Sequence, residues 1–183
     1  MARVLDGISA ELREFLEAQP VFFVATAPTS DDGHINCSPK GLDTFRVLDA
    51  HTVAYLDLTG SGIETVAHLR ENARITLMFC AFDGRPDIIR LYGRGTVVPA
   101  GSPDAADVLA RVPEFPGTRS VIVVDLDRVS SSCGYGVPRM TLDAPRGELV
   151  SWATKKGAPA LAAYQAETNA RSIDGLPGLP GLP

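Results

Sequence analysis

The stretch YLDLTGSGIETVAHLREN, residues 55–72, contains a strand, a glycine turn and a helix in succession. The first four residues and the three before them are rich in β-branched and aromatic side chains, which favours a strand. Gly60 and Gly62 give the turn the backbone freedom that it needs. Ser61 and Glu64 have the spacing of a capping box, which predicts a helix that begins near Gly62.

The start of that helix is a candidate anion site. N–H groups at a helix N-terminus have no partner within the helix, and three hydroxyl side chains are close in sequence: Thr59, Ser61 and Thr65. Glu64 counts against a phosphate there, because two negative groups repel each other. An ordinary capped turn without a ligand explains the same residues, so this stretch alone leaves both interpretations open.

Composition narrows the class of protein. The chain has 183 residues, 45% of them apolar, which predicts one domain with its own core. No apolar run approaches the roughly 20 residues that span a bilayer, and the start of the chain lacks a signal-peptide core, so we expect a cytoplasmic protein. Three cysteines far apart fit a reducing compartment and, like the scattered histidines, form no metal-ligand pattern. The net charge of −5 makes nucleic acid and anionic membrane poor partners.

Most of the chain is predicted to form hairpin-linked strands. These are expected over residues 21–26, 35–38, 44–48, 52–58, 74–82, 87–98 and 120–127. Shorter helical patterns cover residues 9–19, 62–72, 102–112, 147–153 and 158–168. This order predicts a mainly β (α+β) fold, an antiparallel barrel with peripheral helices. We expect a single domain over residues 1–173, followed by a disordered tail of Gly-Leu-Pro repeats over residues 174–183.

Three segments, taken in order, resemble the pyridoxamine-phosphate-oxidase-like family of split-barrel flavin-binding proteins. The segment INCSPKG, residues 35–41, is similar to a family strand that ends in Lys-Gly. Residues 55–72, followed by ARITLMF, are similar to the family's strand–loop–helix–strand phosphate unit. The segment RLYGRG, residues 90–95, resembles a further family strand. The resemblance implies a split barrel that forms a homodimer, with FMN at the interface and a small-molecule substrate.

The resemblance also assigns roles to residues. Lys40 corresponds to a cationic contact to the phosphate or the ring, and Thr59 to a hydroxyl contact. We expect Ser61 to help anchor the phosphate, with Thr65 nearby. The backbone of Cys37 and Ser38 would face the isoalloxazine. Arg90 would reach the ribityl-phosphate region. Asn36, Ser38 and Lys40 alternate and so share one strand face, either as a polar row that lines the cofactor groove or as the solvated face of an edge strand.

A later loop, SCGYGVPRM at residues 132–140, has glycines on both sides of an aromatic residue. Similar loops are found in a bacterial subgroup of the family, and we expect Tyr135 to stack on the flavin ring, with Cys133 and Arg139 on the substrate side. A structural turn with a packed tyrosine is the alternative interpretation.

The chain also departs from the family. Typical oxidases carry Ser-Arg-Lys where this chain has Ile63, Glu64 and Thr65, and their Arg-Leu-x-Pro ending is missing here. We therefore expect an FMN-dependent oxidoreductase that does not oxidise pyridoxamine phosphate, and assign no catalytic residue. The alternatives are a non-catalytic protein that stores or senses flavin or haem, and a reductase that uses the deazaflavin F420.

Overall fold

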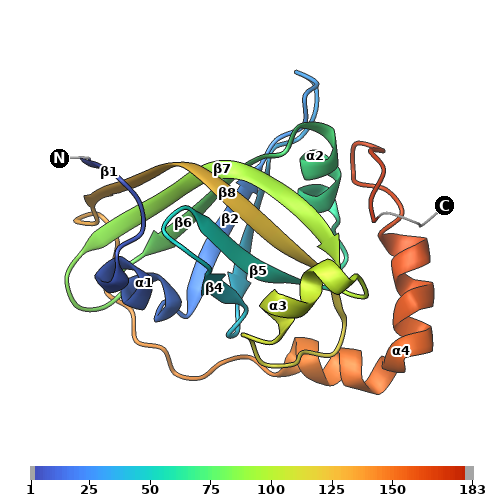
Figure 1. The fold of residues 1–183 in the computed structure, drawn as a ribbon. Helices are drawn as coiled ribbons and strands as arrows, with labels where there is room; N and C mark the ends of the chain where they lie inside the picture. Colours follow the sequence, from blue (N-terminus) through green and yellow to red (C-terminus); the bar gives the residue numbers. More distant parts are fainter. Residues whose placement is uncertain (1–2, 180–183) are drawn as a thin grey trace.

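Alternating strand patterns build one eight-stranded sheet in which every pairing is antiparallel (Figure 1). The structure, a computed structural model, describes residues 3–179. The strands are β1 (Arg3–Leu5), β2 (Val21–Thr26), β3 (Asn36–Gly41), β4 (Phe45–Val47), β5 (Thr52–Leu58), β6 (Arg74–Cys80), β7 (Asp87–Pro99) and β8 (Thr118–Cys133). The helices are α1 (Ala10–Glu17), α2 (Glu64–Asn72), the 3-10 turn η1 (Pro103–Ala105), α3 (Ala106–Leu109) and α4 (Glu148–Thr168).

The strand order β3-β2-β6-β7-β8-β5-β4 curls the sheet into a half-barrel, and β1 is added alongside β8. Helices lie around the barrel, with α2 and α4 at the end opposite β1 (Figure 1). This architecture confirms the predicted antiparallel split barrel with peripheral helices. In residues 3–179, no helix is long and apolar enough to cross a membrane.

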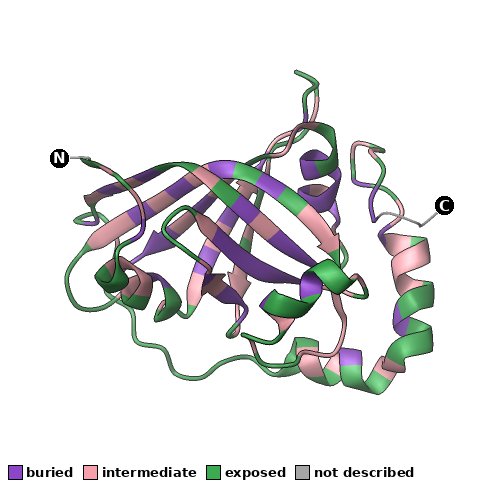
Figure 2. Cartoon of the chain, in the orientation of Figure 1, coloured by how far each residue is buried: buried purple, intermediate pink, exposed green. Residues whose placement is uncertain are grey.

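The main core fills the concave side of the sheet (Figure 2). Phe22 of β2 stacks on Phe79 of β6, with ring centroids 5.3 Å apart, and meets Tyr55 of β5 edge-on. A smaller apolar cluster lies on the other face of β5, under η1 and α3. β5 is therefore buried on both faces. In β6 the inward side chains are buried, whereas on its outer face Cys80 is buried and Thr76 and Met78 are only partly covered.

Helix α2 begins later than its sequence predicts. Its N-cap is Ile63, with no side-chain cap, so the Ser61–Glu64 capping box is wrong. Glu64 is the first helical residue and cannot reach back as the third residue of a capping box would. The helix is closed by Ala73, which has the left-handed conformation.

Two glycines lie where the backbone requires them. β7 shifts register between Tyr92 and Gly93, and a Cβ at Gly93 would lie 2.1 Å from the backbone oxygen of Asp125. Only glycine permits this close approach. Gly157 has φ 71° and divides α4 into the two predicted terminal helices.

Candidate functional site

A buried ion cluster joins two strands far apart in the sheet order. Lys40 of β3 places its Nζ 3.9 Å from Oδ1 of Asp57 on β5. Arg119 of β8 donates to both oxygens of the same carboxylate, at 2.6 Å and 3.2 Å. Ser120 adds a hydrogen bond of 3.2 Å. Asp57 and Arg119 are almost fully buried, so this carboxylate is compensated by fixed donors rather than by water.

Burial lowers the pKa of Lys40, and the Asp57 carboxylate opposes this shift. Lys40 was predicted from the sequence as a site residue, whereas Asp57 and Arg119 were not. Asp57 could have been recognised from the sequence. It lies two residues after Tyr55, so both side chains point to the same side of a strand that is otherwise apolar. An inward carboxylate in such a strand needs a cation, yet its partner is 62 residues away in sequence.

A hydrogen-bonded chain ties β3 to α2. Asn36 donates to the hydroxyl of Thr65 at 3.0 Å and to that of Thr26 at 3.3 Å. The Thr26 hydroxyl also meets Nδ1 of His68 at 2.9 Å. Burial lowers the pKa of His68, which therefore favours the neutral imidazole. Two of the predicted site residues, Asn36 and Thr65, are thus in direct contact.

The loop before α2 is held by the chain itself. The Thr59 hydroxyl donates to the backbone oxygen of Gly117 at 2.6 Å and accepts from Gln165 at 2.8 Å. Asn169 donates to the oxygen of Gly60 at 3.0 Å and accepts from Arg119 at 2.8 Å. The donor of Thr59 is therefore engaged inside the molecule.

The C-terminal segment lies along the same helix start. The N–H of Ile173 donates to Glu64 at 3.3 Å, and Arg70 donates to the backbone oxygen of Gly178. Leu179 is buried in the main core cluster, to which Ile63 also belongs. The tail was expected to be disordered from residue 174, but its described part packs against α2; residues 180–183 lie outside the described residues. A phosphate bound at this helix N-terminus would have to displace the segment and lie beside the Glu64 carboxylate.

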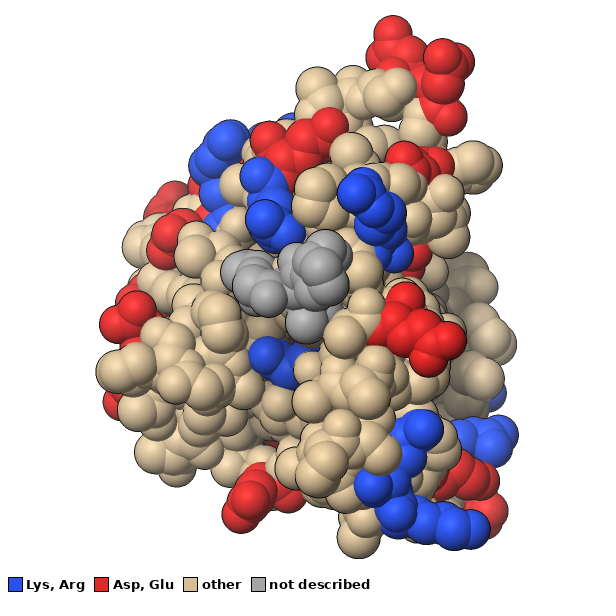
Figure 3. All heavy atoms as spheres, turned by 90° about the vertical axis from the view of Figure 1, so that its right-hand side faces the viewer, with Lys and Arg blue, Asp and Glu red and all other residues tan. Residues whose placement is uncertain are grey.

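Figure 3 shows the side of the molecule at the right of Figure 1, where α4 lies. Basic and acidic side chains are interspersed on this face, outside the atoms drawn in grey, and no extended surface of one sign is visible. Charge on this face therefore gives no general attraction for a polyanion.

The remaining predicted residues fall on other surfaces. Cys37 is exposed on the outer face of β3, whereas Ser38 points to the inner side with Lys40. Arg90 lies on the outer face of β7 and donates to the Ser132 hydroxyl at 3.0 Å. The predicted alternation of Asn36, Ser38 and Lys40 is confirmed, since each pairs with an inward residue of β2. Ser61 lies exposed on the loop before α2.

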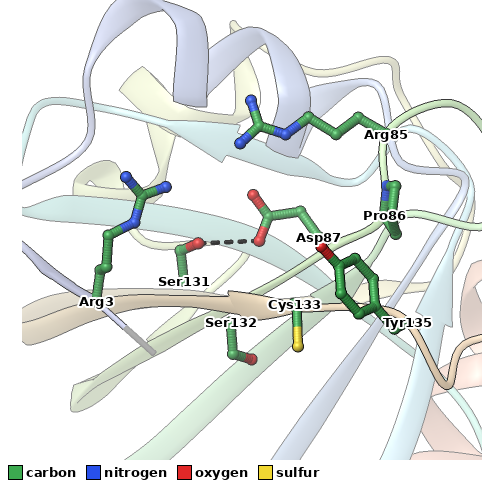
Figure 4. Close-up of a pocket in the computed structure, with 8 residues that line it drawn as sticks. All are labelled: Arg3, Arg85, Pro86, Asp87, Ser131, Ser132, Cys133 and Tyr135. Atoms are coloured by element: carbon green, nitrogen blue, oxygen red, sulfur yellow. Dashed lines mark hydrogen bonds between the residues drawn. The ribbon is translucent and has the colours of Figure 1, made fainter. Parts of the chain in front are cut away.

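Tyr135 is 83% exposed and lines an open cleft of about 420 Å³ at the β1 end of the barrel (Figure 4). The packed-tyrosine alternative is therefore wrong. Its loop is tied to the turn before β7, because Arg139 pairs with Asp83 at 3.1 Å and the N–H of Met140 donates to the oxygen of Phe82 at 2.9 Å. The residues that line this cleft do not include any of the Lys40 cluster.

Three buried side-chain atoms have no hydrogen-bond partner among the described residues: Ser38 Oγ, Tyr55 Oη and His68 Nε2. Burial raises the pKa of Tyr55 well above its usual range, so its hydroxyl keeps its proton. Leaving a buried polar group unpaired costs about 1–3 kcal/mol. Ser38 and Tyr55 lie on the two strands that carry Lys40 and Asp57.

Comparison with known proteins gives one consistent result. A sequence profile described as pyridoxamine 5'-phosphate oxidase matches residues 8–133. The pyridoxamine 5'-phosphate oxidase family protein ustO of Aspergillus flavus is 42% identical over 193 residues, covering 95% of this chain and 76% of the relative. A crystallised variant of HupZ from Group A Streptococcus has a TM-score of 0.54 at 23% identity, covering 68% of this chain and 99% of that one. The FAD binding protein from Mycobacterium smegmatis has a TM-score of 0.51 at 17% identity, covering 71% and 97%. The two solved structures support the fold alone.

Proposed function

Since the chain belongs to the pyridoxamine 5'-phosphate oxidase family, we propose that it binds FMN and acts as an oxidoreductase on a small molecule. The observation that carries the proposal is the inward row of Asn36, Ser38 and Lys40, in which Ser38 Oγ is buried without a partner. That row places a cation and an unused hydroxyl on one side of one strand, while the Asn36 amide already donates to Thr26 and Thr65. A phosphate ester or a flavin carbonyl is the kind of group that such donors bind.

Lys40 would supply the charge-assisted contact, and Ser38 and Tyr55 the neutral donors. Thr59 would take part only if Gly117 and Gln165 released its hydroxyl. Thr65 would take part only if Asn36 released it, whereas Ser61 is exposed on the loop. Bound FMN would supply hydride and electron transfer, for which the protein need only bind and orient the ring and admit the substrate.

A homodimer forms part of the proposal. The outer faces of β2, β6 and β7 carry apolar side chains that are only partly buried in one protomer, among them Phe23, Met78 and Tyr92. Cys37 and Arg90 lie on this same outer face, so a second copy seated there would bring them to the interface. Such a dimer would place the predicted ring-facing backbone of β3 beside the partner subunit.

An F420-dependent reductase is the second candidate. The observation that favours it is Glu64, whose carboxylate lies at the start of α2, where the family's oxidases carry a basic pair. A non-catalytic flavin- or haem-binding protein needs the same fold but no turnover. The chemical identity of the cofactor therefore comes before any assay of the reaction.

The test begins with the visible spectrum of the purified protein and mass spectrometry of the molecule that acid releases. We expect FMN, and expect NAD(P)H to reduce it and an acceptor to reoxidise it. Release of F420 or haem would show that the protein binds that cofactor and not FMN. Bound FMN that no donor reduces would favour a non-catalytic storage protein. A protein that binds none of the three after reconstitution would overturn the proposal.

A further inference from the structure

The cleft beside Tyr135 has a charge arrangement that the proposed cofactor site does not use. It is lined by Arg3 of β1, Arg85 and Pro86 of the turn before β7, Asp87 of β7, and the end of β8. Figure 4 shows Arg3 and Arg85 extending toward the Asp87 carboxylate from different elements. The charged groups come from two segments far apart in sequence, β1 and residues 85–87, so the cleft is assembled by the fold rather than by one local turn.

One oxygen of the Asp87 carboxylate is held by a hydrogen bond from Ser131. Ser131 is nearly buried and donates from Oγ to Oδ1 of Asp87 at 2.9 Å. Among the described residues, no other side chain donates to this carboxylate, so Oδ2 can accept from a bound ligand. The carboxylate is thus oriented and partly unused.

The two guanidinium groups are also unused. Within residues 3–179, neither Arg3 nor Arg85 forms an ion pair, because no carboxylate oxygen lies within 4.0 Å of either guanidinium group. A guanidinium group presents a planar fork of N–H donors that matches a carboxylate. The lining residues together carry two positive charges and one negative charge.

The apolar part of the cleft lies next to these charges. Tyr135 and Pro86 also line a second cleft, of about 340 Å³, whose wall includes Phe82 and Val137. Both volumes fall in the roughly 300–1,000 Å³ range of small-molecule sites. A ligand that enters the first cleft with its polar end can therefore lay a ring or an aliphatic group against Tyr135.

We propose that this cleft binds a free α-amino acid with an aromatic side chain. Its carboxylate would be bound by Arg3 and Arg85, its ammonium by Asp87, and its ring by Tyr135. A simple carboxylic acid would leave Asp87 facing an anion without compensation, whereas a zwitterion matches both signs. That the amino acid is a substrate rests on the proposed function. Its binding in the cleft does not need a flavin.

The test is isothermal titration calorimetry of the flavin-free protein with L-phenylalanine. Phenylalanine methyl ester lacks the carboxylate charge, and N-acetyl-phenylalanine lacks the ammonium. We expect phenylalanine to bind and each analogue to bind at least tenfold more weakly, the loss expected for one charge-assisted hydrogen bond. Equal binding of the ester would refute the guanidinium contacts, and equal binding of the acetyl compound would refute the role of Asp87.

Variants show whether phenylalanine binding depends on the cleft residues or on the overall charge of the protein. Arg85 is on an exposed turn, so Arg85→Ala should leave the fold intact and weaken phenylalanine binding at least tenfold. Arg128→Ala, at an exposed position elsewhere on β8, is the matched control and should change nothing. Asp87→Asn should abolish the preference for phenylalanine over its N-acetyl form while the preference over the ester remains.

A parallel FMN titration keeps the two proposals apart. If the protein binds phenylalanine but not FMN, the proposed function is refuted and the amino-acid site in the cleft is supported. FMN binding without phenylalanine binding, in a wild-type protein that melts cooperatively, would overturn this inference and leave the cofactor site.

Discussion

Replacing Arg119 by methionine tests whether the buried ion cluster holds the barrel closed. The side chains of Arg119 and Asp57 are only 5% and 1% exposed. The substitution removes both hydrogen bonds to the carboxylate, together with those to Asn169 and to the backbone oxygen of Gly62. Asp57 would then be left with Ser120 and with Lys40 at 3.9 Å.

Removing one partner of a buried ion pair typically costs about 3–5 kcal/mol, because the other charge stays buried without compensation. For a chain of this length, each kcal/mol lowers the melting temperature by about 2–4 °C. We therefore expect Arg119→Met to lower it by roughly 6–20 °C. The loss should appear equally in urea unfolding followed by circular dichroism.

Arg111→Met is the matched control. Arg111 pairs with Asp107 at 3.0 Å, but these side chains are 46% and 74% exposed. Exposed pairs of this kind contribute about 0–1 kcal/mol, since water already solvates both charges. If the two variants lost the same stability, the reasoning from burial would be refuted.

Three further predictions concern other parts of the fold. Gly93→Ala should destabilise the protein by about 1–3 kcal/mol or prevent folding, because its Cβ would meet the backbone of β8, whereas Gly101→Ala, with open space around it, should change the urea midpoint little. Burial lowers the pKa of His68 in the folded state, so the unfolded chain binds more protons than the folded one as pH falls through the ordinary histidine pKa of about 6.5. The free energy of unfolding of the wild type should therefore decrease in this pH range, and His68→Gln should flatten this part of the pH profile. Lys40→Met should cost under about 1 kcal/mol of stability, since Arg119 still compensates Asp57, yet weaken FMN binding by about tenfold or more in a fluorescence titration. Loss of folding without a specific loss of FMN affinity would make Lys40 structural.

The sequence by itself determined features that depend on near neighbours. Period-two alternation placed Asn36, Ser38 and Lys40 on one face of β3, because successive side chains of a strand point to opposite sides. The separate helical patterns of residues 147–153 and 158–168 predicted the break in α4, which falls at Gly157 because positive φ is easily reached only by glycine. Most strands and the antiparallel order followed from the same local patterns, and the family resemblance came from segments that are short and contiguous.

Only the tertiary structure decided which distant groups meet. Strand register and closure of the barrel brought Lys40, Asp57 and Arg119 together, although 62 residues separate the last two. Glu64 had a local partner by spacing but bonds to Ile173, since the helix begins at Glu64 and the C-terminal segment returns to it. The cleft of Arg3, Arg85 and Asp87 likewise exists only because β1 pairs with β8. Such contacts depend on how the chain closes on itself, and no local pattern encodes that closure.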